Sequence, residues 1–322
     1  MCLISVIIPV YNSAEYLNDC IESVISAAIP DIEIILVADG LTDESAEICR
    51  QYSAKYPCVK AYMQSGSGFS AARNHGFCHA SGEYVAFFDS ADYIDGKLFS
   101  DALNKLKECG ADILITDFHR VSDKGSVFER VYQIQEGSLK TGRESLISFL
   151  ESGTCVWNLQ RYIFRREFLT SNKLRFSEAY STAEDPEFIT RALRLCQTPA
   201  FCHSPFYNYR VNYSESHTHC INVEKLRRLL RMLERAHLSL DNNDVSAMLR
   251  ALLAREYIWS LPFLYELPKE ERHLALRLLK NSVGLLDGAD GIYSFAAKAE
   301  RLLGVRIAAA IMSAAKKFNQ QK

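Results

Sequence analysis

The 322-residue sequence lacks most features that would place it in a special class of protein. Its ten cysteines include no Cys-x-x-Cys pair, so neither a zinc site of that type nor a compact disulfide framework is indicated. It has no internal repeat, no low-complexity segment and no apolar stretch long enough to span a bilayer. No signal peptide is recognisable either. We therefore expect a cytosolic globular chain whose thiols are reduced and mostly buried.

A large excess of charge of one sign is also missing. The formal net charge is −2, and this near balance gives no reason to expect a nucleic acid partner. The charge is unevenly distributed, because residues 1–219 carry 20 basic and 28 acidic side chains whereas residues 220–322 carry 17 and 11. The C-terminal region is therefore expected either to meet an anionic partner or to consist of solvated helices with surplus arginines.

What the first third does contain is an alternation of short apolar segments and helical patterns. The apolar segments have no polar face, so the strands that they predict must be covered on both sides. This favours an α/β fold, Rossmann-like, with a mainly parallel sheet, right-handed crossovers and helices on both faces. Strands are predicted over 3–10, 33–37, 59–63, 83–88 and 112–116, and helices over 13–27, 43–55, 70–80 and 97–109.

The rest of the chain changes character twice. Residues 120–140 are more polar and predict a hairpin or an irregular excursion of the chain. Residues 143–219 mix helical and extended patterns, with one helix over 188–195. From residue 222 onward the pattern is almost purely helical, which predicts a C-terminal all-helical region. Its helices are expected over 222–240, 243–265, 268–282 and 293–318.

Polar residues gather where the predicted strands end, and ligands of an open parallel sheet bind at that edge. An aromatic ring beside a carboxylate suits a nucleobase. An acidic cluster suits Mg²⁺ or Mn²⁺, which can hold a diphosphate. The strand ends in chain order are Tyr11-Asn12, Asp39-Gly40, Gly66-Ser67-Gly68 and Asp89-Ser90-Ala91-Asp92.

The glycine segment has a second interpretation. Residues 66–71 fit the dinucleotide-binding pattern, with Asp89 about 20 residues further on. That fingerprint belongs to the first strand–helix turn of the unit, and here the first turn, residues 11–14, has no glycine. A nicotinamide or flavin enzyme is therefore disfavoured.

Two later groups can also carry chemistry. Glu184 and Asp185 precede a predicted helix, where acids usually serve as caps. Beside a bound nucleotide, one of them can instead act as a general base on a hydroxyl nucleophile. His217 and His219 can supply a metal ligand or contact a phosphate, or they are exposed loop histidines.

Five segments together are typical of a known family: 5–12, 33–40, 70–74, 82–90 and Glu184-Asp185. Over roughly residues 3–215 the chain resembles the family 2 inverting glycosyltransferases, which have the GT-A fold. The resemblance implies a nucleotide-sugar-binding half at 1–115 and an acceptor-binding half at 116–219. The C-terminal helical region at 220–322 lies outside the shared core and is predicted from its helical pattern.

The resemblance also implies roles for individual residues. Tyr11 would stack on the donor base, commonly uracil, and Asp39 would accept a hydrogen bond from it. Asp185, with Glu184 beside it, would be the catalytic base of an inverting transfer from a UDP-sugar to a glycan or lipid-linked acceptor. The implied donor-binding set is Pro9, Tyr11, Asp39, Gly68, Arg73, Asp89 and Ser90; the metal ligands are Asp89, Asp92 and His219; and the acceptor or diphosphate contacts are Arg210 and His217.

Ala91 departs from the family pattern, because it stands in the DxD element where an aspartate normally touches the metal. A methyl group has no lone pair for Mn²⁺ or Mg²⁺, so metal binding is expected to be weakened. An alternative therefore stays open: a non-catalytic, glycosyltransferase-like binding protein. The basic segment 305–318 likewise predicts either peripheral contact with an anionic inner-membrane face or a helix packed on the protein.

Overall fold

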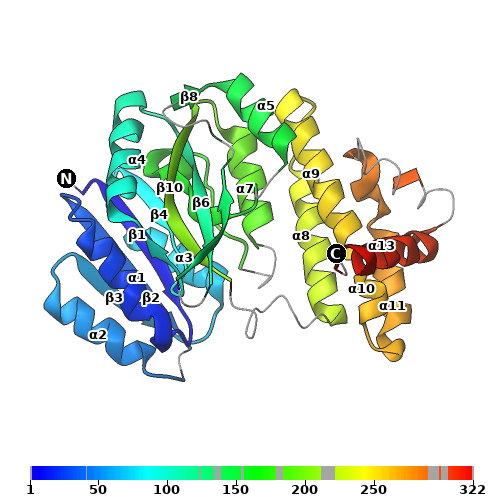
Figure 1. The fold of residues 1–322 in the computed structure, drawn as a ribbon, viewed down its shortest axis with the longest axis horizontal. Coiled ribbons are helices and arrows are strands. Elements are labelled where there is room, and N and C mark those ends of the chain that lie inside the picture. The colour runs from blue at the N-terminus through cyan, green and yellow to red at the C-terminus, as the bar shows by residue number, and fades with distance from the viewer. Residues whose placement is uncertain are drawn as a thin grey trace. The chain divides into compact units, whose positions relative to one another are not determined.

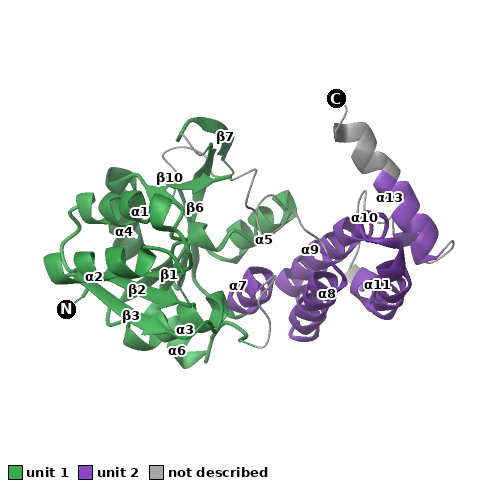
Figure 2. Cartoon of the chain, turned by 90° about the horizontal axis from the view of Figure 1, so that it is seen from below, with its two compact units in different colours: residues 1–181, 195–214 green, residues 182–194, 215–322 purple. Residues whose placement is uncertain are grey.

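A computed structural model describes residues 2–40, 42–122, 125–132, 134, 139–153, 156–178, 184–211, 222–288, 297–298 and 304–320. The chain divides into two compact units, coloured separately in Figure 2. Unit 1 contains residues 1–181 and 195–214, and unit 2 contains residues 182–194 and 215–322. This division differs from the predicted boundaries mainly in assigning residues 182–194 to the helical unit.

Unit 1 is built on one sheet (Figure 1), whose described strands lie in the order β3-β2-β1-β4-β9-β6-β10-β5, with β7 beside β6 and β8 beside β10. The strands from β3 to β4 are all parallel, whereas β9 is antiparallel to both β4 and β6. The bounds are β1 (Ile4–Val10), β2 (Ile32–Asp39), β3 (Val59–Gln64), β4 (Tyr84–Phe87), β5 (Tyr93–Ile94), β6 (Ile113–Val121), β7 (Val127–Val131), β8 (Leu139–Thr141), β9 (Tyr162–Arg165) and β10 (Pro199–Arg210).

Helices cover both faces of this sheet, which confirms the predicted α/β fold. On one face, side chains of α1 and α4 share a hydrophobic core with alternate residues of β1, such as Val6 and Ile8. On the other face α3 packs so closely that a Cβ on Gly76 would lie 2.5 Å from a methyl carbon of Ile7. The helices are α1 (Ala14–Ser26), α2 (Ser45–Lys55), α3 (Phe69–His79), α4 (Gly96–Cys109), α5 (Arg143–Ser152), η1 (Leu159–Arg161) and α6 (Arg166–Ser171).

Unit 2 is helical, as predicted for the C-terminal region. Asn222 and Asn243 cap α8 and α9, where their side chains accept hydrogen bonds from the backbone of Lys225 and Ser246. The predicted helix 243–265 is divided at Pro262, which cannot donate a backbone hydrogen bond. The helices are α7 (Glu184–Leu195), α8 (Val223–Leu238), α9 (Asp244–Ser260), α10 (Phe263–Glu266), α11 (Lys269–Asn281), η2 (Val283–Gly288) and α13 (Val305–Gln320).

The first turns of α13 bury one face and expose another. Val305, Ala308 and Ala309 are buried, whereas Ile307 and Ile311 are 45% and 41% exposed. The helix therefore packs on the protein along its alanine face, which is one of the two predicted alternatives. Among the residues that the structure describes, no helix combines the length and the apolar character needed to cross a membrane.

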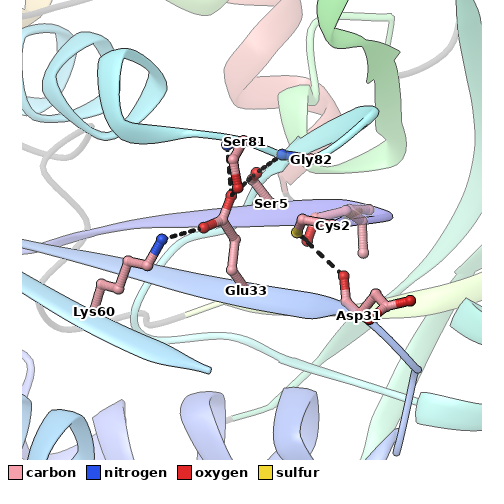
Figure 3. A network of polar contacts seen from close by, with 8 residues as sticks. Cys2, Ser5, Asp31, Glu33, Lys60, Ser81 and Gly82 are labelled. Carbon is pink, nitrogen blue, oxygen red and sulfur yellow. Dashed lines mark hydrogen bonds and ion pairs between the residues drawn. The ribbon is translucent and has the colours of Figure 1, made fainter. Parts of the chain in front are cut away.

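A buried carboxylate connects the amino ends of the parallel strands (Figure 3). Glu33 on β2 is 5% exposed, and its Oε1 accepts hydrogen bonds from the Ser5 hydroxyl at 2.5 Å and the Ser81 backbone at 2.6 Å. Its Oε2 accepts from Lys60 Nζ at 2.6 Å. Burial alone raises the pKa of Glu33, but the hydrogen bonds from Lys60, Ser5 and Ser81 outweigh it and lower the pKa to about 2.

The depressed pKa of Glu33 predicts a specific pH dependence of stability. The ionised carboxylate stabilises the fold above its ordinary pKa of 4.5, and this contribution is lost as the pH falls toward 2. Glu33→Gln should lower the free energy of unfolding at pH 7 by about 2–4 kcal/mol. It should also make the decrease in this free energy below pH 4.5 less steep. Urea denaturation between pH 7 and 2.5 measures both effects.

The matched control is Glu47→Gln, since Glu47 pairs with Arg50 on an exposed helix surface. This control should change both the stability and its pH dependence much less than Glu33→Gln does, because exposed ion pairs contribute little. An equally steep loss of stability below pH 4.5 in Glu33→Gln would contradict the assignment.

Candidate functional site

Asp39 and the glycine loop lie together, as the strand order predicts. Asp39 ends β2 and is 4% exposed; its two carboxylate oxygens accept hydrogen bonds from the backbone of Ser67 at 2.8 Å and Gly68 at 2.6 Å. The loop approaches the turn after β2 so closely that a Cβ on Gly40 would lie 2.9 Å from the Cα of Gly66. Each carboxylate oxygen keeps a further lone pair, so Asp39 can fix the loop and still accept from a ligand.

Tyr11 lies directly after β1 and presents its ring to solvent. The residue is 44% exposed, and its ring meets the edge of Phe69 with centroids 6.5 Å apart. The next residue, Asn12, exchanges two hydrogen bonds of 2.9 Å with Thr42, in the turn after β2. Pro9 is buried inside β1 and pairs with Val37. The structure thus holds an exposed aromatic ring beside the β2 turn, which is what stacking on a base requires.

Asp89 is the exposed acid of the cluster after β4. Its Oδ1 accepts from Arg73 at 3.2 Å, and its Oδ2 accepts from the side-chain amide of Gln160. The Asp89 side chain is 31% exposed, whereas that of Arg73 is 5% exposed. The structure therefore brings together Arg73 and Asp89, two residues of the predicted donor-binding set. Gln160 is an additional partner that no local sequence signal identifies, and Ser90 is buried.

Asp92 is placed differently from Asp89. It is 2% exposed, its Oδ2 accepts from the Tyr207 hydroxyl at 2.7 Å, and its Oδ1 accepts from the Arg210 backbone at 2.7 Å. Burial, followed by the nearby charge of Asp89, raises the pKa of Asp92 well above its ordinary value. Asp92 is therefore held against β10. Its role as a metal ligand stays a prediction, and it requires Asp92 to exchange these partners.

Arg210 is engaged with the protein on several sides. Its guanidinium donates to the Ala91 carbonyl at 2.9 Å and to Asp19 at 2.8 Å. It also lies 5.0 and 4.9 Å from the ring centroids of Tyr16 and Tyr93, and its side chain is 6% exposed. In this arrangement Arg210 connects the acidic turn, residues 89–92, to α1. Any contact between Arg210 and a diphosphate therefore requires Arg210 to exchange these partners.

The described residues do not form a complete metal centre. None of their histidine, cysteine, aspartate and glutamate side chains form a group of three that could hold an ion. Of the predicted ligands, Asp89 is exposed and Asp92 is buried. His219, like His217, lies outside the described residues. Of the predicted ligands that the structure describes, Asp89 alone thus has a partly exposed carboxylate.

Glu184 and Asp185 belong to unit 2, where they begin α7 and are partly exposed. Further along the same helix Glu187 is fully buried and pairs with Arg191 at 2.7 Å and with Arg235 of α8 at 3.1 Å. These ion pairs anchor α7 to its own unit and so fix the two acids at the helix N-terminus. The role of Asp185 as a base stays a prediction.

Comparison with known proteins shows the family and the fold of the chain. The chain matches the family described as Glycosyl transferase family 2 over residues 5–175. The solved structure of S. aureus TarS 1–349 in complex with UDP-GlcNAc resembles it with a TM-score of 0.76 at 20% identity, covering 98% of this chain and 92% of that one. At this identity the likeness shows the fold alone.

Two sequence relatives are bacterial glycosyltransferases. The uncharacterized glycosyltransferase EpsJ of Bacillus subtilis is 30% identical over 211 residues, which cover 65% of this chain and 61% of EpsJ. The poly(ribitol-phosphate) beta-glucosyltransferase of Bacillus spizizenii is 30% identical over 194 residues, covering 59% of this chain and 29% of that protein. The chain thus spans less than two thirds of either relative.

Taken together, the sheet order and the strand-end site define an α/β protein with the GT-A fold. The chain belongs to glycosyltransferase family 2.

The hydroxyl of Tyr207 serves two buried groups at this site, which leads to a prediction. It donates to Asp92 and accepts from the Asp89 backbone at 3.0 Å. Tyr207→Phe leaves both groups without this partner and should lower the free energy of unfolding by about 1–3 kcal/mol in urea denaturation at pH 7. Tyr93→Phe is the control, because that hydroxyl makes one longer bond, 3.3 Å, to Gly125. Equal stability of Tyr207→Phe and the unmodified chain would refute the assignment.

Proposed function

We propose that the chain transfers a sugar from a nucleotide-sugar, a UDP-sugar in particular, to a glycan or lipid-linked acceptor with inversion at the anomeric carbon. The observation that carries this proposal is the grouping at one sheet edge. Tyr11, Asp39 and the Asp89–Arg73 pair follow or adjoin strands β1, β2 and β4, which are parallel neighbours. The family membership supports the same chemistry.

In the proposed donor complex, the exposed ring of Tyr11 stacks on the base and Asp39 accepts a hydrogen bond from a ring N–H. The hydrogen bonds from Ser67 and Gly68 to Asp39 keep this carboxylate oriented. Asp89, held between Arg73 and Gln160, accepts from the ribose hydroxyls. These groups are fixed before the ligand arrives, so little ordering has to accompany binding.

The transfer itself is a single displacement. Asp185 takes the proton of the acceptor hydroxyl, whose oxygen attacks the anomeric carbon as the bond to the diphosphate breaks on the opposite side. UDP leaves with the bonding electron pair, and the configuration inverts. Family 2 enzymes typically use a divalent cation, which offsets charge on such a leaving group. The described residues form no group of three donors for that ion, so we assign it no step here.

The acceptor class is supported by the relatives and by the charge distribution. Named relatives act on bacterial envelope polymers, among them the Bacillus spizizenii poly(ribitol-phosphate) beta-glucosyltransferase and the minor teichoic acid biosynthesis protein GgaB of Bacillus subtilis. The basic surplus of residues 220–322 suits an anionic acceptor or the anionic face of a membrane that carries it. We therefore propose a role in building a surface polysaccharide or glycolipid.

A second candidate function is a degenerate, non-catalytic binding protein. It is favoured by the methyl group of Ala91 together with the burial of Asp92, which leave the acidic turn with one exposed carboxylate. Under this alternative the protein keeps the shape of the enzyme without its activity, and it binds a glycan or a partner enzyme. Metal-enhanced UDP binding counts against this alternative, and absence of UDP binding favours it.

The donor site is tested by calorimetric titration with UDP, with and without Mn²⁺. Tyr11→Ala should weaken UDP binding roughly 10- to 100-fold, since stacking on an aromatic ring contributes about 1–3 kcal/mol per base. Phe128→Ala, which removes a ring that is 50% exposed on β7, should leave the affinity unchanged. Equal UDP affinity of Tyr11→Ala and the unmodified chain would disprove the stacking role.

The base is tested by comparing two neighbouring substitutions. Asp185→Asn should reduce sugar transfer by about 10²–10⁴-fold while UDP affinity stays the same, because a general base acts on the acceptor hydroxyl. Glu184→Gln is the matched control and should retain most of the activity. The measurement is release of UDP in the presence of acceptor. Full activity in Asp185→Asn would rule out this base.

A further inference from the structure

Away from the strand-end site, α3 carries two histidines one helical turn apart. His75 and His79 are four residues apart, so they lie on the same face of the helix, and their ring centroids are 5.1 Å apart. We propose that this pair binds one transition-metal ion of the Ni²⁺, Cu²⁺ or Zn²⁺ type, with solvent completing the coordination sphere. The proposal does not rest on the proposed function.

Each imidazole contacts a residue of β3 in addition to the other histidine. His75 Nδ1 lies 3.1 Å from Gln64 Oε1. An amide oxygen only accepts, so this contact favours the tautomer with the proton on Nδ1 and a lone pair on Nε2. The ring of His79 stacks on Tyr62 with centroids 4.1 Å apart and planes 14° apart. Partners of this kind orient the ligands of metal sites and fix the tautomer of a ligating histidine.

The spacing of the rings fits a shared ion. Metal–nitrogen bonds of about 2.0–2.1 Å at a tetrahedral ion place the centres of two imidazoles about 5 Å apart, close to the observed separation. His79 is exposed, so an ion can reach the pair from solvent. No third histidine, cysteine, aspartate or glutamate joins it among the described side chains. We therefore expect an exchangeable ion with open coordination positions.

The donor atoms determine the class of metal. Two imidazole nitrogens without a carboxylate favour Ni²⁺, Cu²⁺ and Zn²⁺ over Mg²⁺ and Mn²⁺. The acidic turn has the opposite preference, because its donors are oxygens. The histidine pair and the acidic turn can therefore be distinguished by whether the bound ion is Ni²⁺, Cu²⁺ or Zn²⁺, or instead Mg²⁺ or Mn²⁺.

The experiment is a calorimetric titration of the untagged full chain with NiCl₂. The chain used for the titration carries the substitutions His217→Asn and His219→Asn, so that these two histidines do not bind Ni²⁺. One Ni²⁺ should bind per chain, and the midpoint of thermal unfolding should rise with Ni²⁺ because the ion binds the native helix. His79→Phe, which keeps an aromatic ring against Tyr62 but removes both nitrogens, should weaken binding at least tenfold. His273→Asn, at an exposed position of α11, should not change it.

Absence of saturable Ni²⁺ binding would overturn the proposal, and so would equal affinity in His79→Phe and its parent. Displacement of Ni²⁺ by an equal concentration of Mg²⁺ would also overturn it, since that result requires oxygen ligands.

Discussion

The buried carboxyl of Asp92 holds the acidic turn after β4 against the end of β10. Its two hydrogen-bond donors, the Tyr207 hydroxyl and the Arg210 backbone, lie 115 and 118 residues away in the sequence. A buried polar group must be paired to avoid a large desolvation cost, so this connection leaves the turn little freedom. Tyr207 also accepts from the Asp89 backbone, and the position of the exposed acid is thereby set by a distant strand.

The residues that line the proposed donor site could be predicted because their signals are local. Strand β1 was expected over 3–10 and spans Ile4–Val10; α1 was expected over 13–27 and spans Ala14–Ser26. Strands of this kind are recognisable because their residues are apolar on both faces. The polar residue that follows each parallel strand must then lie at the same edge of the sheet. Tyr11, Asp39 and Asp89 were found in this way.

The residues that hold the acidic turn in place, Gln160 and Tyr207, could not be predicted, because they come from distant or irregular segments of the chain. Gln160 lies in the short helix η1, just before β9, a four-residue strand that enters antiparallel between β4 and β6. Residues 143–219 were expected only as a mixture of helical and extended segments. Nothing in the sequence around Gln160 or Tyr207 indicates that each would bond to the turn at Asp89.

The acidic turn also shows how neighbouring residues acquire different roles. Its backbone closes with a hydrogen bond from the Asp92 N–H to the Asp89 carbonyl at 3.1 Å. One acid is left partly exposed and the other buried, so Asp92 must move before it can replace the carboxylate missing at Ala91. The fold and the proposed ligand class do not depend on residue 91. Metal use, and with it the leaving-group chemistry, is predicted to depend on it directly.

The measurement that tests this account most directly is a crystal structure of the chain with UDP and Mn²⁺. The account predicts the uracil ring against Tyr11 and within hydrogen-bonding distance of Asp39, with the ribose or diphosphate at Asp89. UDP bound at another surface, with Tyr11 and Asp39 left uncontacted, would contradict it.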